Sequence, residues 1–334
     1  MSRAQLTSTV EQSSGGAVAP FLAGKNKIIN GDFSVWQRGT SFSNPAINAY
    51  TADKIIQGNN ASGVAFVDSQ QVFTPGTAPV AGYESAYFYR RNVTTAGSGG
   101  QYNFIQQRIE DIRTLAGQTV TFSFWAKADS ARTVSVNLTQ NSGSGGTGGA
   151  NFNSSNITLS TAWTRYSITT TLTSLSGVTI GTSSYLAVVL NMPINTTMTI
   201  DTWGWQLEAG SVATPFTTAS NTFQGELALC QRYYQQFNAN TPLGNGEIRY
   251  STTAYCIIKL AQTMRTAPTA TFNNPTAYYV NSYGKSGAAA TIGLDISGTD
   301  FYGIIFTGLS GYTAGQSSYI GIGGAGNLQL SAEL

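Results

Sequence analysis

The residues that could carry acid–base or metal chemistry are few in this chain, and none of them is a histidine. Histidine is the commonest general base and the commonest transition-metal ligand, so other side chains would have to take both roles. A glycosidase needs two carboxylates flanking the scissile bond. No spacing singles out such a pair among Glu84, Glu110, Asp111, Glu208, Asp295 and Asp300. We therefore predict a protein that is not an enzyme and requires no cofactor.

Aromatic side chains are stronger candidates, because Trp and Tyr rings can stack on sugars while polar neighbours hydrogen-bond the hydroxyls. In the alternating run at residues 119–126, Phe122 and Phe124 share one face and Trp125 lies on the other. Trp125 is therefore predicted either in a carbohydrate-binding face or under a neighbouring element. Core packing is predicted for the other tryptophans, which are Trp36, Trp163, Trp203 and Trp205.

A second group of candidate carbohydrate-binding residues consists of tyrosines that lie among Gly, Ser and Asn. These are Tyr278, Tyr279, Tyr283, Tyr302, Tyr312 and Tyr319. Tyrosine supplies contact area at a low cost in conformational entropy, which suits it to binding surfaces. The same composition also suits an interface between subunits, and the sequence leaves both readings open.

The charge content restricts the class of partner. Charged residues make up only 10% of the chain, against roughly 25% in an ordinary soluble domain. A surface built from Ser, Thr, Asn, Gln and Gly suits uncharged partners such as sugars, and equally suits a protein that lives in an extracellular assembly. The net charge is +2, and the densest basic spot is Arg90 with Arg91. A nucleic-acid binder needs a larger basic cluster, so we expect no nucleic-acid partner.

Cys230 and Cys256 are the only cysteines. Two free buried thiols are predicted, with one disulfide as the alternative. The first residues lack the apolar core of a signal peptide, and no stretch approaches the roughly 20 apolar residues of a membrane span. We therefore expect no membrane insertion.

Short runs of alternating apolar and polar residues dominate the chain, the period-2 pattern of half-buried strands. Within residues 197–207 the apolar phase slips, which predicts a β-bulge near Asp201 and Thr202. Residues 224–236 instead carry Leu227, Cys230 and Tyr234 at helical spacing. The predicted fold class is all-β, with a jelly-roll β-sandwich followed by a linking helix and a second, smaller β-domain.

The composition along the chain predicts where these parts begin and end. Residues 1–25 are polar and rich in Gly and Ala, which is typical of an arm that orders only against a partner. The jelly roll is assigned to residues 26–217, the linker and helix to 218–237, and the C-terminal β-domain to 238–334.

Five segments follow one another in order along the chain: residues 26–42, 50–54, 106–117 with 121–127, 206–216 and 224–235. Together they resemble a family of bacteriophage and prophage tail-fibre or spike proteins with a carbohydrate-binding-module-like jelly roll. The family often has Trp where Ile55 or Ile56 stands here. The resemblance implies a virion component, often a homotrimer, that is made in the host cytoplasm and acts outside the cell on the particle. It also implies that the N-terminal arm docks to other virion proteins.

The resemblance further implies a structural Ca²⁺ between the first and last strands of the jelly roll. Asp32 and Asp201 match the places of its ligands, but Ser34 stands where such modules often carry an acidic residue. Alternatively, Asp32 caps a turn and Asp201 makes hydrogen bonds at the predicted bulge. Asp32 and Asp201 are therefore candidate calcium ligands.

The resulting functional prediction is a non-catalytic fibre or spike subunit that attaches the virion to host surface polysaccharide. The alternative is a purely structural virion protein of the head, collar or tail. A polysaccharide depolymerase is the third reading, and the absence of a carboxylate pair with suitable spacing disfavours it.

Overall fold

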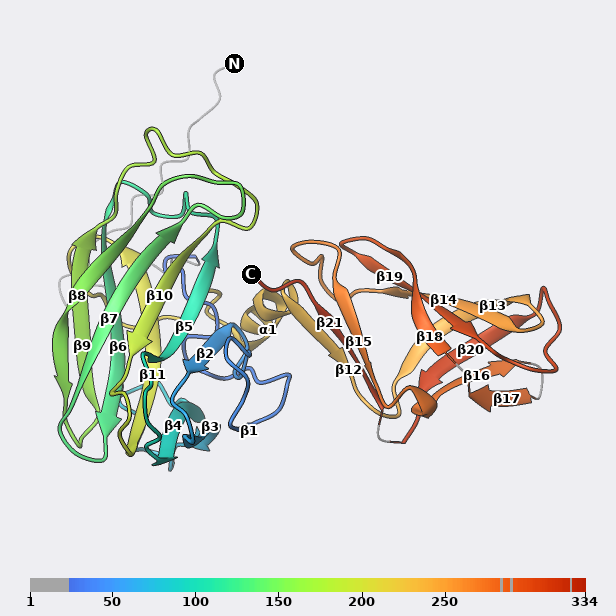
Figure 1. Cartoon of the computed structure of the whole chain (residues 1–334), viewed down its shortest axis with the longest axis horizontal. Helices are drawn as coiled ribbons and strands as arrows, with labels where there is room; N and C mark the ends of the chain where they lie inside the picture. The colour runs from blue at the N-terminus through green and yellow to red at the C-terminus, as the bar shows by residue number, and fades with distance from the viewer. Residues whose placement is uncertain (1–23, 283–284, 289–290, 325) are drawn as a thin grey trace, which may run out of the picture.

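The computed structural model describes residues 24–282, 285–288, 291–324 and 326–334. The chain forms a β-sandwich, a short helix and a second, smaller β-domain, which lie in that order from left to right in Figure 1. Each domain has its own cluster of buried apolar side chains. The predicted all-β class, with a jelly-roll sandwich, a linking helix and a second β-domain, is confirmed.

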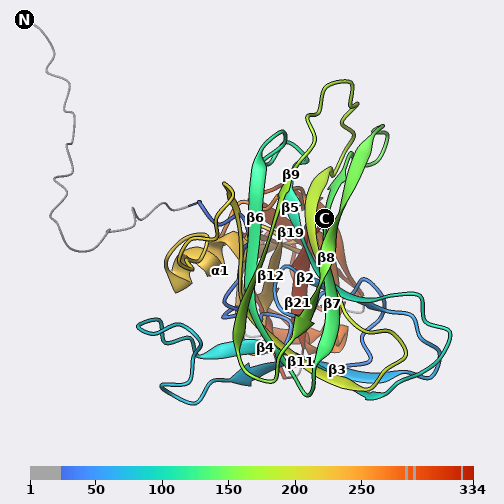
Figure 2. The ribbon, with the colours of Figure 1, turned by 90° about the vertical axis from the view of Figure 1, so that its left-hand side faces the viewer.

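The sandwich consists of two antiparallel sheets, seen nearly edge-on in Figure 2, where β6 of one sheet lies to the left of β7 and β8 of the other. The six-stranded sheet has the order β1 (Ser41–Ser43), β3 (Ala65–Val72), β4 (Tyr87–Thr95), β11 (Met198–Ala209), β6 (Thr119–Ala128) and β9 (Thr164–Thr171). The five-stranded sheet has the order β2 (Ile55–Asn59), β5 (Asn103–Glu110), β10 (Tyr185–Asn191), β7 (Arg132–Asn141) and β8 (Gly149–Leu159).

The alternation in β6 produces the core face that the sequence predicts. Val120, Phe122, Phe124 and Ala126 are all buried between the two sheets. Successive side chains of a strand point to opposite faces, so Trp125 lies on the outer side of this sheet. That outer side is not open to solvent, because a second aromatic layer covers it.

A β-bulge in β11 sends two tryptophans to opposite faces of the six-stranded sheet. The pairing with β6 shifts register between Trp203 and Gln206, two residues beyond the predicted position. Trp205 packs inward against Phe122, while Trp203 packs outward against Trp125. Gly204 sits in the bulge with φ of +65°, a left-handed conformation that glycine adopts without strain.

Helix α1 (Phe223–Gln231) is shorter than predicted. It begins after Thr222, whose hydroxyl caps the backbone N–H of Gly225. Residues 234–236, predicted as helix, belong to strand β12 instead because they pair with β21 of the C-terminal domain. Pairing with a distant strand thus overrides the local helical spacing.

The C-terminal domain packs a small sheet and a large sheet around its core. The three-stranded sheet has the order β12 (Tyr234–Phe237), β21 (Asn327–Ser331) and β15 (Thr269–Asn273). The seven-stranded sheet has the order β17 (Lys285–Ala288), β16 (Tyr278–Ser282), β20 (Ser317–Ile322), β13 (Pro242–Tyr250), β14 (Thr253–Lys259), β19 (Phe301–Thr307) and β18 (Thr291–Ser297). A single 3-10 turn, Pro275–Ala277, precedes β16 in the described chain.

Both cysteines are free and buried, as predicted. Burial raises the pKa of each thiol, and that of Cys256 to about 11. Across the described ranges, no helix is long and apolar enough to cross a membrane.

Candidate functional site

The outer face of the five-stranded sheet carries a row of uncharged polar side chains on β7, beside Ala187 and Val189 of β10. Leu138 of β7 and Val188 of β10 lie opposite each other in register and are fully buried between the sheets. Because side chains alternate along a strand, Asn137 and Thr139 on β7 point to the opposite, outer face. Asn191 on β10 lies on this same face.

We call this surface the amide face. Its side chains are Gln106 on β5, Ser135, Asn137, Thr139 and Asn141 on β7, and Asn191 on β10. All of these except the buried Gln106 are partly exposed. Each carboxamide offers a donor and an acceptor, and each hydroxyl offers both. Such a surface can hydrogen-bond neutral polyols without the desolvation cost of a charged group.

Aromatic rings stand at both ends of the amide face. Phe104, opposite Asn191, lies flat over the sheet, since a Cβ on the neighbouring Gly58 would come within 2.5 Å of its ring. The ring of Tyr102 lies beside it, at 5.6 Å between centroids. Tyr185 stands at the other end of β10, about 20 Å away at the usual rise per strand residue. Such rings are suitable surfaces for stacking sugar rings at either end.

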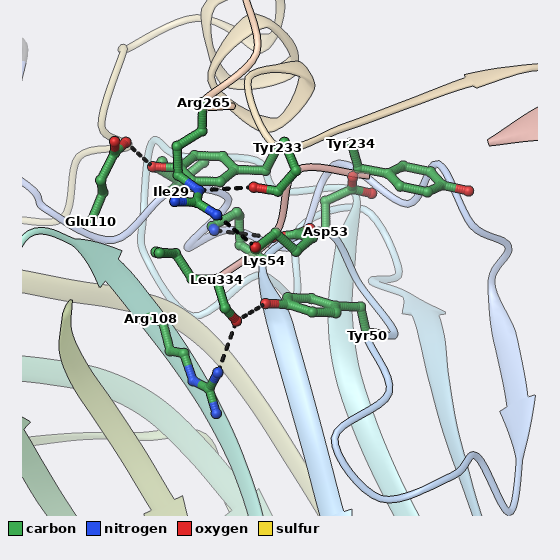
Figure 3. Close-up of polar contacts among 12 residues, drawn as sticks. Ile29, Tyr50, Asp53, Lys54, Arg108, Glu110, Tyr233, Tyr234, Arg265 and Leu334 are labelled. Carbon is green, nitrogen blue, oxygen red and sulfur yellow. Dashed lines mark hydrogen bonds and ion pairs between the residues drawn. The ribbon is translucent and has the colours of Figure 1, made fainter. Parts of the chain in front are cut away.

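The C-terminal part of the chain closes the β5 edge of this face (Figure 3). The main-chain oxygen of Leu334 accepts hydrogen bonds from Arg108 at 2.8 Å and from Tyr50 at 2.9 Å. Glu110 accepts from the hydroxyl of Tyr233 at 2.9 Å and forms an ion pair with Arg232 at 3.0 Å. Arg108 and Glu110 of β5 are therefore engaged by later parts of the chain, and the accessible part of the amide face lies on β7 and at Asn191 of β10.

A buried charge cluster lies behind this edge. Glu333 pairs with Lys54 at 3.2 Å and with Arg38 at 2.9 Å. The Lys54 ammonium also lies 3.3 Å from the centre of the Tyr233 ring. Burial lowers the pKa of Lys54, whereas burial raises the pKa of Asp53 to about 6 despite the nearby Arg38. These charges hold the two domains together and are not accessible to a ligand.

Trp125 does not form a binding face, so this part of the prediction is corrected. Its side chain is only 8% exposed. Phe216 and Trp203 pack on it, and the Arg165 guanidinium lies 4.6 Å from its ring centre. The alternative reading, in which Trp125 lies under a neighbouring element, describes the structure.

Three of the predicted sugar-binding tyrosines are core residues. Tyr278, Tyr302 and Tyr312 are 0%, 2% and 7% exposed and pack in the C-terminal core. The hydroxyls of Tyr278 and Tyr312 donate to main-chain oxygens of Asn327 and Val280. A ring enclosed in the core cannot stack on a sugar, and the prediction is wrong for these three residues.

Two predicted tyrosines do lie together on a surface. The alternation of β16 sends Tyr278 inward and Tyr279 outward, where its ring lies 6.2 Å from that of Tyr319 on β20. Tyr319 is 38% exposed. Tyr283 lies outside the described residues. The structure thus retains Tyr279 and Tyr319 as candidate surface residues.

Asp32 and Asp201 do not form the predicted calcium site. Both oxygens of Asp201 accept from Arg90, at 2.6 and 2.8 Å, and Lys127 lies 3.6 Å away. Asp32 accepts from the backbone N–H and the hydroxyl of Ser34, which is the turn-capping alternative. No group of three Asp, Glu, Cys or His that could hold a metal ion occurs in the part of the chain that the structure describes. The prediction is corrected because two cations occupy Asp201.

Residues 56–184 match the family of carbohydrate binding domains. This range includes β5 and β7, which carry most of the amide face, and ends just before β10. The match supports carbohydrate binding by the sandwich, which is a binding function and not a catalytic one. Curated protein sequences give no match to the chain.

Solved structures that match the chain are distant from it in sequence. A CBM4 structure is 18% identical, with 54% of this chain and 98% of that chain covered and a TM-score of 0.34. The enzymatically active domain of tailspike protein 4 from bacteriophage CBA120 is 14% identical, with 56% and 22% covered and a TM-score of 0.35. A family 11 carbohydrate-binding module from Clostridium thermocellum is 10% identical, with 52% and 98% covered and a TM-score of 0.32.

The amide face was not among the sites predicted from sequence, although its signal is present there. In the run at residues 134–138, Val134, Val136 and Leu138 alternate with Ser135 and Asn137. The polar residues of this run, Ser135 and Asn137, lie on the outer face. What the run cannot reveal is that β5 and β10 bring further polar side chains alongside it.

Proposed function

We propose that this chain is a non-catalytic fibre or spike subunit of a bacteriophage particle that binds host surface polysaccharide through the amide face. The observation that carries the proposal is the row of partly exposed amides and hydroxyls on β7, with Asn191 of β10 beside it, inside or next to the range that matches carbohydrate binding domains. The resemblance of five ordered segments to phage fibre and spike proteins supports the virion setting.

The proposed mechanism is weak recognition made effective by multiplicity. A glycan strand lies across β10 and β7, where Asn137, Thr139 and Asn191 exchange hydrogen bonds with its hydroxyls. Phe104 and Tyr185 bound the strand at its two ends. In the proposed homotrimer, anchored to other virion proteins by residues 1–25, several such contacts act together and give avidity that a single site lacks.

The test is binding of the full chain to immobilised polysaccharide extracted from candidate host cells, with xylan and soluble β-glucan as further probes. The double substitution Asn137→Ala and Asn191→Ala is expected to weaken binding at least tenfold, because it removes amides from neighbouring strands. A matched control is Ser167→Ala with Thr171→Ala, which truncates exposed side chains on the outer face of the other sheet.

Equal binding by both double variants would contradict the amide face as the site. No saturable binding to any of these polysaccharides would contradict attachment as the function. Release of reducing ends during the same incubations would contradict the non-catalytic assignment.

A purely structural virion role is the second candidate, and one specific observation favours it. The C-terminal domain exposes large aliphatic side chains, with Ile257 61%, Leu294 53% and Ile296 52% exposed. Exposed apolar surface of this kind is typical of an interface between proteins. The substitutions Ile257→Ser and Leu294→Ser separate the two roles: loss of assembly in sedimentation with unchanged glycan binding places the patch in a subunit interface.

A further inference from the structure

A cavity of about 360 Å³ lies on the sandwich away from the amide face. Three segments that are distant in sequence line it: Asp32 with Ser34, residues 82–86 between β3 and β4, and residues 218–226 at the start of α1. Volumes of this size are within the range of small-ligand pockets. None of the residues that line this cavity belongs to the amide face.

One carboxylate in this cavity has hydrogen-bonding capacity left over. Asp32 is 9% exposed, and its Oδ1 atom accepts from Ser34. Its Oδ2 atom has only the Tyr83 hydroxyl, at the long distance of 3.5 Å. Because a carboxylate oxygen has two lone-pair positions, Oδ2 can accept hydrogen bonds from a ligand.

The second buried carboxylate in the cavity has a different role. Glu226 accepts from the backbone N–H of Asn30 at 2.7 Å. It also accepts from the backbone and hydroxyl of Ser220, at 2.7 and 2.8 Å. Its oxygens are thus used to tie α1 to the sandwich, which fixes one wall of the cavity.

Aromatic rings and an amide complete the lining. Phe223, on the first turn of α1, is 55% exposed. Tyr83 on the β3–β4 connection and Asn221 before α1 also line the cavity. An exposed ring beside acceptor and donor side chains matches what a sugar presents, which is an apolar face edged by hydroxyls.

The lining also restricts the charge of the ligand. Asp32, Glu84 and Glu226 line the cavity, and neither Lys nor Arg does. Uronic acids, sialic acids and phosphates would meet only like charge and find no cation to pair with.

We propose that this cavity is a second carbohydrate site, which takes a single neutral sugar ring with its hydroxyls on Asp32 and its apolar face on Phe223. It would hold one residue or the end of a glycan, in contrast to the extended strand on the amide face. The two sites are built from different elements and can be tested independently.

The structure supplies an internal reporter for the test. The indole N–H of Trp203 donates to the hydroxyl oxygen of Ser85 at 2.8 Å, and Ser85 lines the cavity. We would titrate the full chain with the methyl glycosides of glucose, galactose and mannose and with N-acetylglucosamine, and follow intrinsic fluorescence. At least one should give saturable binding with a dissociation constant on the order of 1 mM, as expected for a ligand of this size. Saturation-transfer NMR on the sugar protons gives a readout that does not depend on Trp203.

Two substitutions locate the binding. Asp32→Asn and Phe223→Ala should each weaken it tenfold or more, with circular dichroism confirming that both variants fold. Tyr250→Ala is the matched control, because this ring is similarly exposed, at 61%, on the C-terminal domain. It should leave the titration unchanged.

Several results would overturn the proposal. One is no saturable binding of any neutral sugar by either readout, and another is equal binding by Asp32→Asn, Phe223→Ala and the parent chain. Glucosamine is titrated as a cationic comparison, and its binding without binding of N-acetylglucosamine would show a cation site instead. Loss of monosaccharide binding in the double variant Asn137→Ala and Asn191→Ala would show that the amide face, not the cavity, binds the monosaccharide. Unchanged polysaccharide binding by Asp32→Asn would leave the amide-face proposal standing on its own.

Discussion

At the scale of single residues, the sandwich contains a fully buried ion pair, whose two charges are costly to remove from water. Arg91 and Asp68 are both 0% exposed and share two hydrogen bonds, at 2.7 and 2.6 Å. Arg91 also donates to the Asn103 side chain at 2.6 Å. Burying two charges is costly, and good geometry together with complete hydrogen bonding offsets that cost. The pair connects β3, β4 and β5 across the edge of the two sheets.

Removing one partner of this pair should be severely destabilising. Asp68→Ala leaves the Arg91 guanidinium buried without its counterion, and we expect the free energy of unfolding to fall by about 3–5 kcal/mol. Urea unfolding followed by fluorescence measures the change. Asp129→Ala is the control, since Asp129 and Arg132 form a largely exposed pair for which less than about 1 kcal/mol is expected. Similar losses in the two variants would contradict this view of the core.

Asp53 should make stability depend on pH in a direction opposite to that of an ordinary paired carboxylate. Burial raises its pKa from 3.8 to about 6, so the folded chain retains a proton that the unfolded chain has released. The free energy of unfolding should therefore decrease as the pH rises from about 4 to about 6, by up to about 3 kcal/mol from this group. Asp53→Asn should lack this decrease in urea unfolding between pH 4 and pH 7. Parallel pH profiles for the parent chain and Asp53→Asn, with the exposed Asp295→Asn as control, would refute the prediction.

At the scale of elements, the bulge in β11 determines to which face of the six-stranded sheet Trp203 and Trp205 point. Without the extra residue, Trp203 and Trp205 would point to the same face. The bulge instead places Trp205 in the core between the sheets and Trp203 in the outer layer, where its indole N–H donates to Ser85, a residue that lines the second cavity. One irregularity thus supports both the core and a candidate site.

Gly204→Ala should destabilise the chain by more than about 1 kcal/mol, because two effects act together. The residue has φ of +65°, and an added Cβ would lie 2.6 Å from the Trp125 ring. Thermal or urea unfolding measures the loss. Gly293→Ala is the matched control, since that glycine has an ordinary φ and its Cβ would meet only a side-chain methyl at 3.7 Å. A larger loss in the control than in Gly204→Ala would disprove the argument.

At the scale of the whole molecule, the helix is not the only connection between the two domains. Arg265 of the second domain donates to main-chain oxygens of Ala332 and Glu333, which positions the segment that reaches the sandwich (Figure 3). There Glu333 meets Lys54 and Arg38. The second domain therefore borders the amide face at a fixed edge, which would present both domains to a surface in one orientation.

Glu333→Gln should loosen this arrangement while each domain stays folded. The variant keeps the side-chain shape but leaves Lys54, which is 1% exposed, without its anionic partner. We expect a larger radius of gyration in small-angle X-ray scattering and two resolved calorimetric transitions. Glu247→Gln, in an exposed pair within the second domain, should change neither. One unchanged transition in Glu333→Gln would show that the helix suffices to join the domains.

The sequence by itself determined the class of fold and much of its layout. Alternation predicted the core face of β6, because period 2 is a local property of a half-buried strand. It also predicted a bulge in β11 and a helix after residue 222, each within a few residues. The low charge predicted a surface of uncharged polar side chains, which suits sugars and equally suits a protein in an extracellular assembly. The amide side chains on β7 were visible in the same alternation.

Only the tertiary structure decided which of these surfaces are covered. Alternation placed Trp125 on the outer face, but Phe216, which is far along the chain, buries it. Alternation could not tell that Tyr278 points inward and Tyr279 outward, because strand β16 carries one tyrosine on each face. The pairing of β12 with β21 ends the helix earlier than predicted. The ion pair with Arg90 occupies the carboxylate of Asp201, which was predicted as a calcium ligand. These outcomes depend on contacts between distant segments, and local sequence carries no record of which segments will meet.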